Sequence, residues 1–258
     1  MVKPLRKKRV GVYGGTFDPI HNGHVEVARA VVEHFELDTL LIVPAASPPH
    51  KRGRSISGTF HRYAMSVLAT LEVPKTVVST IEIDGPETPY TYQTLARLKT
   101  TYGPQVQLLF VMGSDSFEEM HTWKEPRQIL TACSVVVAAR PGHSFSHSFR
   151  HGFRQGFGCN IGTFQTDLSE STASGGGHDL EEAAGPEFHT VDVRGKKETI
   201  REGDAASGYI YLTDYVSNDI SSTTIRIRAY RRLSVRDLVP PAVADYMEKY
   251  ELYRAEEI

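Results

Sequence analysis

Short apolar runs alternate with amphipathic stretches over residues 9–142. A continuous apolar run is typical of a buried parallel strand, and apolar residues three or four positions apart are typical of a helix. The pattern predicts strands at residues 9–13, 39–43, 76–83, 106–112 and 134–139, and helices at residues 23–35, 60–71, 92–102 and 126–131. Strands interleaved with helices build a parallel sheet with helices on both faces. The sequence therefore predicts an α/β fold with a doubly wound parallel sheet.

This alternation stops at residue 143. The next sixteen residues read HSFS, HSFR, HGFR and QGFG, and Ser- and Gly-rich sequence follows. His143, His147 and His151 would share one face of a helix, which leaves a metal site open as an alternative. Glycines within the repeat weaken such a helix, and no acidic residue or cysteine stands at ligand spacing. We favour a mobile low-complexity insertion at about 143–208.

Regular structure is expected again after the insertion. Residues 209–212 form another β-like run, and residues 221–232 and 242–250 have helical spacing, so the chain should end in helices. Without the insertion about 190 residues remain, an ordinary size for one domain. We predict a single domain over residues 9–258, interrupted by the insertion and preceded by a basic lead-in at residues 1–8.

Charge and cysteine content narrow the class of protein. The 29 Lys and Arg nearly balance the 31 Asp and Glu, which argues against a nucleic-acid partner. No apolar run approaches the roughly 18 residues that span a bilayer, so no membrane partner is expected. Cys133 and Cys159 show no C-x-x-C spacing, and Cys133 is expected to be a buried hydrophobe rather than a nucleophile. These features predict a cytoplasmic protein; the basic N-terminus leaves a nuclear location open for a eukaryotic source.

The strongest candidate site is the segment GGTFDPIHNGH, which follows the first predicted strand. Gly14 and Gly15 allow backbone N–H groups to approach a phosphate, and the following helix directs its positive end at the same place. His21 and His24 are three positions apart, so both rings can face one ligand. The alternative is a glycine-rich turn with two exposed histidines. The preceding strand, the glycine pair and Thr16 favour a phosphate site.

Two further clusters are suited to the same polyphosphate. In ISSTTIR, Ser222 and Thr223 open a helix with Arg226 in its first turns, which combines free N–H groups, hydroxyls and a guanidinium. An ordinary helix cap is the alternative for this segment. In PPHK, Lys51 follows the second predicted strand, and loops at the ends of parallel strands are where doubly wound sheets bind ligands.

The segment GSDSFEEMHTW follows the fourth predicted strand directly. Asp115 stands where a carboxylate can accept hydrogen bonds from ribose hydroxyls. Trp123, the only tryptophan of the chain, can stack on an aromatic ring, with core packing as the alternative.

These motifs, in this order, resemble the nicotinate/nicotinamide mononucleotide adenylyltransferases of the H-x-G-H nucleotidyltransferase superfamily. GGTFDPIHNGH alone indicates only the superfamily. The narrower resemblance rests on PPHK, PYTYQT, GSD with its downstream Trp, ARPG, ISSTTIR and LVPPAVADYMEKYELY, and it covers residues 9–142 and about 209–254. PPHK is similar to the bacterial branch, whereas the ending is shared with eukaryotic members.

The resemblance implies a Rossmann-like nucleotidyltransferase fold and a role for each matching residue. The implied catalytic residues are His21, His24, Lys51 and Arg226; the implied ATP-binding residues are Gly14, Gly15, Thr16, Phe17, Gly113, Asp115, Ser222 and Thr223. Thr91 and Trp123 would hold the pyridine ring of the mononucleotide. Gln93 stands where members with this pattern often have an acid, and the spacer after ARPG is longer than usual.

The implied activity joins nicotinate or nicotinamide mononucleotide to the AMP part of ATP and releases pyrophosphate, in NAD biosynthesis. The implied partners are ATP and the mononucleotide; a homo-oligomer is left open. Mg²⁺ is expected on the ATP phosphates, because no Asp/Glu pair resembles a dedicated cage. Three alternatives remain: a pantetheine-phosphate adenylyltransferase, a cytidylyltransferase, or a non-catalytic nucleotide-binding scaffold. The sequence leaves the choice between nicotinate and nicotinamide open.

Overall fold

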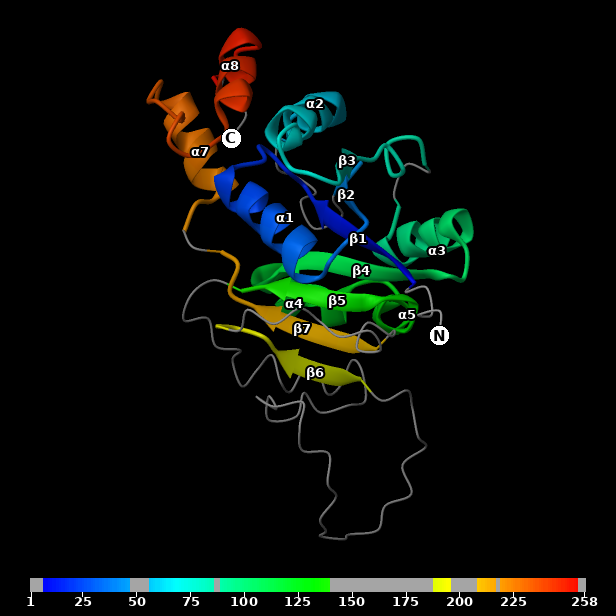
Figure 1. The fold of residues 1–258 in the computed structure, drawn as a ribbon. Coiled ribbons are helices and arrows are strands. Elements are labelled where there is room, and N and C mark those ends of the chain that lie inside the picture. Colours follow the sequence, from blue (N-terminus) through cyan, green and yellow to red (C-terminus); the bar gives the residue numbers. More distant parts are fainter. Residues whose placement is uncertain are drawn as a thin grey trace, which may run out of the picture.

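The computed structural model describes residues 7–46, 56–85, 89–139, 188–195, 208–216 and 219–254. In this part of the chain, seven strands form one sheet in the order β3-β2-β1-β4-β5-β7-β6, and each neighbouring pair is parallel (Figure 1). The strands are β1 Lys8–Gly15, β2 Thr39–Pro44, β3 Thr76–Val78, β4 Val106–Gly113, β5 Ser134–Ala138, β6 His189–Asp192 and β7 Tyr209–Thr213. The predicted α/β fold with a doubly wound parallel sheet is confirmed.

Helices connect the strands and complete the C-terminal part of the described chain. They are α1 Asn22–His34, α2 Thr59–Thr70, α3 Thr91–Tyr102, α4 Ser114–Glu119, the short 3₁₀ helix η2 Met120–Thr122, α5 Pro126–Ala132, α7 Ser222–Tyr230 and α8 Pro241–Lys249. The predicted helices are confirmed, with ends that differ from the predicted ones by one or two residues.

Alternate residues of each central strand face two hydrophobic layers. Leu109 and Val111 of β4 belong to the layer that contains apolar residues of α1, α2, α7 and α8. Leu108 and Phe110 of the same strand belong to the layer that contains residues of α3, α4 and α5. Both faces of the central part of the sheet are thus buried, which explains why the central strands are continuously apolar in sequence.

Two predicted elements differ from the structure. The third strand ends at Val78 rather than at residue 83, because residues 81–84 form a turn in which the Asp84 N–H donates to the Thr80 carbonyl at 2.8 Å. Strand β6 lies inside the predicted insertion at 143–208 and pairs in parallel with β7 at the edge of the sheet. This part of the insertion therefore belongs to the fold.

The sequence of β6 explains why it was missed. Only its last two residues, Val191 and Asp192, are buried, and Asp192 is charged. Arg194 neutralises that carboxylate with a paired hydrogen bond from its guanidinium. An edge strand with one buried apolar residue gives no run that hydrophobic patterning can detect. His143, His147 and His151 lie outside the described residues.

Two further predictions concern the burial of Cys133 and the absence of a membrane-spanning segment. Cys133 is 2% exposed, and burial raises the pKa of its thiol to about 12. It is therefore a buried hydrophobe, as predicted, and not a reactive thiolate at neutral pH. In the described part of the chain, no helix is long and apolar enough to cross a membrane.

Candidate active site

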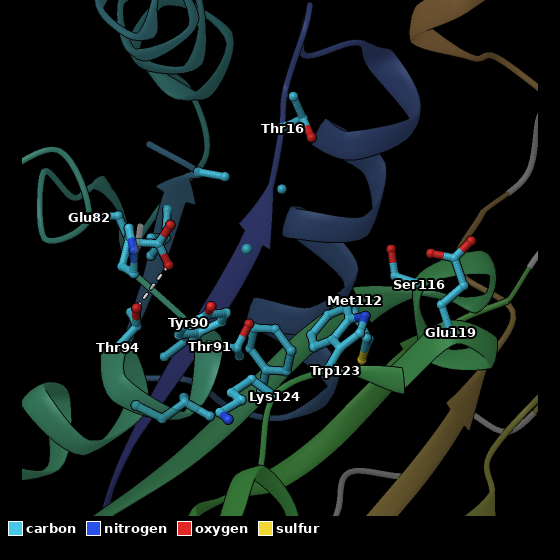
Figure 2. A pocket seen from close by; sticks show the side chains of 18 of the residues that line it. Thr16, Glu82, Tyr90, Thr91, Thr94, Met112, Ser116, Glu119, Trp123 and Lys124 are labelled. Atoms are coloured by element: carbon cyan, nitrogen blue, oxygen red, sulfur yellow. Dashed lines mark hydrogen bonds between the residues drawn. The ribbon is translucent and has the colours of Figure 1, made fainter. Parts of the chain in front are cut away.

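A cavity of about 490 Å³ opens at the carboxyl ends of β1, β2 and β4 (Figure 2). It lies at the point between β1 and β4 where the order of the strands in the sheet reverses. Doubly wound sheets bind ligands at this switch point. The strands and the residues directly after β1 and β2 contribute Val12, Gly14, Gly15, Thr16, Val43, Ala45, Phe110 and Met112. The connections and helices contribute Glu82, Pro89, Tyr90, Thr91, Thr94, Leu95, Ser116, Glu119, Thr122, Trp123 and Lys124.

The glycine pair brings the backbone of β1 close to aromatic rings. A Cβ atom at Gly14 would lie 3.2 Å from the ring of Phe110, and one at Gly15 would lie 2.7 Å from the ring of Phe17. The second distance is shorter than any ordinary carbon contact, so a side chain at position 15 requires Phe17 to move. Gly14, Gly15 and Thr16 all line the cavity, while the predicted approach of the glycine backbone to a phosphate stays a prediction.

Thr91 and Trp123 lie in this same cavity, although they come from different elements. Thr91 is the first residue of α3, and Trp123 follows η2. The indole ring packs edge-on against Phe110, with ring centroids 6.4 Å apart, and it also lines the cavity. The packing of Trp123 against the core is therefore observed, and its role in holding a ligand ring stays a prediction that its place in the cavity lining allows.

His21 and His24 meet at the start of α1. Their ring centroids are 3.7 Å apart, and the Nδ1 atom of His24 accepts a hydrogen bond from the backbone N–H of His21 at 3.2 Å. An Nδ1 atom that accepts a hydrogen bond carries no proton, so the N–H of the neutral His24 ring is on Nε2. Phe17, 2% exposed, packs edge-on against His24 at 5.1 Å. Phe17 therefore supports His24 from the core instead of lining the cavity.

The start of α7 packs against the loop that joins β1 to α1. The Ser222 hydroxyl donates to the Pro19 carbonyl at 2.9 Å, and Arg226 Nη1 donates to the Asp18 carbonyl at 2.7 Å. Arg226 Nη2 also donates to the Thr223 hydroxyl at 3.3 Å. About 200 positions of sequence separate these partners. The structure therefore brings ISSTTIR and GGTFDPIHNGH together, as a shared polyphosphate site requires.

Asp18 is held from a second direction by the C-terminal part of the described chain. The Tyr253 hydroxyl donates to Asp18 Oδ1 at 2.7 Å, and Asp18 is only 3% exposed. Burial raises the pKa of Tyr253, so its hydroxyl keeps the proton that it donates. Sequence patterning had assigned no role to either residue.

Replacing Tyr253 by phenylalanine is expected to lower the free energy of unfolding by about 2 kcal/mol, because a buried carboxylate loses a hydrogen bond. Urea-induced unfolding measures this change. Tyr250→Phe is a matched control on a ring that is 48% exposed, and it should change the same quantity by less than about 0.5 kcal/mol. Equal effects of the two substitutions would show that the Asp18 contact contributes nothing particular.

Arg62 connects the loops around the cavity. Its guanidinium donates to the carbonyls of Thr16 and Ala46, at 2.9 and 3.3 Å, while Nε donates to the carbonyl of Ser57 at 2.9 Å. Arg62 is 1% exposed, so these bonds lie away from water. The side chain thereby ties the ends of β1 and β2 to the segment that begins α2. An arginine inside a predicted helix gives no sequence signal for this role.

Glu82 is another residue of the site that sequence patterning missed. It lines the cavity and accepts a hydrogen bond from the Thr94 hydroxyl at 2.9 Å. Burial raises the pKa of Glu82 to about 7, although hydrogen bonds from Thr94 and the Ala46 backbone and the charges of Arg62 and Arg97 act in the opposite direction. Its position had been predicted as part of a strand, which offered no reason to single it out.

Several predicted residues do not line this cavity: His21, His24, Ser222, Thr223 and Arg226 lie at or against the loop between β1 and α1, and Gly113 and Asp115 lie at the start of α4. Gly113 precedes α4 as its N-cap, and Asp115 is an exposed residue in the first turn of that helix. Gln93 Oε1 accepts from the Tyr90 N–H at 3.1 Å, so this residue caps α3. Lys51 lies outside the described residues. The roles of Gly113, Asp115 and Lys51, like those of the other predicted site residues, thus stay predictions.

Comparison with known proteins adds to this geometry. The profile of the cytidylyltransferase-like family matches residues 12–228. A protein of Thermoanaerobacter sp. named "Probable nicotinate-nucleotide adenylyltransferase" is 34% identical over 252 residues, 98% of this chain and 97% of the relative. A protein of Moorella thermoacetica with the same name is 33% identical over 249 residues, 96% of this chain and 93% of the relative.

The fold has solved counterparts as well. The structure titled "Plasmodium falciparum nicotinic acid mononucleotide adenylyltransferase complexed with NaAD" matches with a TM-score of 0.63 at 16% identity, over 95% of this chain and 97% of that chain. At this identity the match supports the fold alone. The family profile and the full-length relatives show more: the chain belongs to the cytidylyltransferase-like family, in the group of the nicotinate-nucleotide adenylyltransferases.

Proposed function

We propose that this protein joins nicotinate mononucleotide to the AMP part of ATP and releases pyrophosphate, which supplies a dinucleotide precursor of NAD. The supporting observation is one cavity that contains Thr91 and Trp123 and is lined by the Gly14–Thr16 backbone. The loop that follows Thr16 leads to the paired rings of His21 and His24 and accepts a hydrogen bond from Arg226. An aromatic ring can bind at the Trp123 end while the phosphates lie along the loop. The full-length relatives named for this activity support the same conclusion.

The residues of the site suit an in-line transfer without a covalent intermediate. A phosphate oxygen of the mononucleotide attacks the α-phosphorus of ATP, and pyrophosphate leaves. Negative charge builds up on the phosphate oxygens, where hydrogen-bond donors lower the barrier. His24 Nε2–H, the Arg226 guanidinium and the Thr223 hydroxyl are the proposed donors. The Ser222 hydroxyl donates to the Pro19 carbonyl, so Ser222 is proposed to act through its backbone N–H at the start of α7.

In this proposal, the metal ion is bound by the phosphates of the nucleotide. Within the described residues, no group of three His, Cys, Asp or Glu side chains is placed to hold a metal ion. The buried carboxylate of Asp18 is already engaged by Tyr253. We therefore expect Mg²⁺ on the ATP phosphates, where it neutralises charge on the leaving pyrophosphate.

The test is an assay of the full chain with ATP and one acceptor at a time, in which pyrophosphate and the dinucleotide are both measured. Nicotinate mononucleotide should give stoichiometric amounts of nicotinate adenine dinucleotide and pyrophosphate. Phosphopantetheine with ATP, and choline phosphate with CTP, are the control pairs for the alternative transferases. Product from a control pair alone would refute the proposal, and nucleotide binding without any product would favour a non-catalytic scaffold.

A further inference from the structure

Glu82 takes no part in the proposed transfer, yet its carboxyl group lies in the cavity where the mononucleotide would bind. Figure 2 shows Glu82 and Thr94 on one side of the cavity, Trp123 in the middle, and Ser116 and Glu119 on the other side. The Glu82 side chain is fixed by its 2.9 Å hydrogen bond from Thr94, which is itself 3% exposed. A carboxyl group held in a largely buried position acts on any charge that enters the same cavity.

We propose that Glu82 is a specificity-determining residue, whose charge sets the preference between a pyridine ring that bears a carboxylate and one that bears a carboxamide. This inference rests on the proposed function. The two mononucleotides have the same phosphate, ribose and pyridinium charge, so interactions with those groups cancel in a comparison. Only the ring substituent differs. An ionised Glu82 repels the nicotinate carboxylate and can accept a hydrogen bond from the nicotinamide amide group, whereas a neutral Glu82 does not repel nicotinate.

Several charged and titratable groups act on Glu82 or share its cavity. Arg62 on α2 and Arg97 on α3 favour the charged form of Glu82, as do the hydrogen bonds from Thr94 and the Ala46 backbone. The other ionisable residues of the cavity lining are Tyr90, Glu119 and Lys124, and Asp84 is exposed in the same turn as Glu82. Burial outweighs these interactions and raises the pKa of Glu82 to about 7. The charge of Glu82 therefore changes in the neutral range.

The preference between the two mononucleotides should therefore depend on pH. Below pH 7 Glu82 is mainly neutral and nicotinate mononucleotide is used without repulsion. Above pH 7 the carboxylate forms, so the preference shifts toward nicotinamide mononucleotide. The phosphate groups also titrate near pH 6, but they are common to both substrates and drop out of the ratio.

The test is a competition in which both mononucleotides and ATP are mixed and the two dinucleotide products are quantified from pH 6 to pH 9. For the wild type, the ratio of nicotinate to nicotinamide product should fall by about tenfold as Glu82 ionises, since two charges in one cavity interact at an effective dielectric constant of about 20. Glu82→Gln should keep the low-pH ratio at every pH. Asp84→Asn, a matched change at an exposed carboxylate of the same turn, should retain the wild-type pH dependence.

A second variant tests the same group without removing it. Thr94→Val deletes the hydrogen bond that stabilises the charged carboxylate, so the pKa of Glu82 should rise and the midpoint of the ratio curve should move to higher pH. Thr94→Ser should restore the midpoint.

A wild-type ratio that does not vary with pH would overturn the role of Glu82. An equal pH dependence in Glu82→Gln, or an unmoved midpoint in Thr94→Val, would do the same. Failure to form either dinucleotide would instead overturn the proposed function itself.

Discussion

Replacing His24 by alanine is expected to lower kcat by about 100-fold or more, while the KM for ATP changes by less than about threefold. The hydrogen bond from the His21 N–H occupies Nδ1 of His24, so the ring donates through Nε2. A donor that acts mainly on charge developing in the transition state affects turnover more than binding. Initial rates of pyrophosphate release at varied ATP concentration measure both constants.

A control variant separates the two roles of His24, which are capping the start of α1 through Nδ1 and donating a hydrogen bond through Nε2. In His24→Asn, the amide oxygen can take the place of Nδ1 and accept from the His21 N–H, but no donor reaches the position of Nε2. We expect this variant to match the wild type in melting temperature and to remain as slow as His24→Ala. Recovery of turnover in His24→Asn would show that His24 serves only to cap the helix.

Replacing Arg226 by lysine is expected to lower kcat/KM for ATP by about 100-fold, equivalent to about 2.7 kcal/mol. The guanidinium donates to the Asp18 carbonyl through Nη1 and to the Thr223 hydroxyl through Nη2, so it is held in one orientation with N–H groups left to bind a phosphate. Lysine keeps the charge but loses this planar set of donors. Steady-state kinetics with ATP as the varied substrate checks the loss.

The matched control is Arg228→Lys on the same helix. Arg228 pairs with Asp237 at 2.9 Å on the surface, where the exposed fractions of the two side chains are 33% and 60%. Exposed ion pairs contribute little, so we expect kcat/KM to change by less than about twofold. A comparable loss in both variants would indicate a general effect on α7 and would contradict a particular role for Arg226.

The sheet and the glycine-rich segment at the end of β1 could be predicted because their signals are local. Strands such as β4 are buried on both faces and therefore form apolar runs, and the glycine pair forms the end of another such strand, β1. Thr91 and Trp123 could be assigned only through the resemblance of their segments to a known family. Their placement in one cavity then agreed with that assignment.

Glu82, Arg62 and the Asp18–Tyr253 pair could not be predicted, because their importance comes from burial by distant segments. Glu82 titrates near neutrality only because the surrounding structure removes it from water. Arg62 donates to three backbone carbonyls, and every residue type has a backbone carbonyl, so the sequence does not indicate these partners. Asp18 and Tyr253 are 235 positions apart, and no periodicity relates them.

The contact between Asp18 and Tyr253 also has a consequence for protein synthesis. The glycine-histidine segment leaves the ribosome early, whereas Ser222, Arg226 and Tyr253, which hold the same loop, are translated more than 200 positions later. A nascent chain can form β1 and α1 long before these partners exist. The site is therefore completed only after α7 and Tyr253 have emerged, so incomplete chains should not turn over ATP while they are still attached to the ribosome.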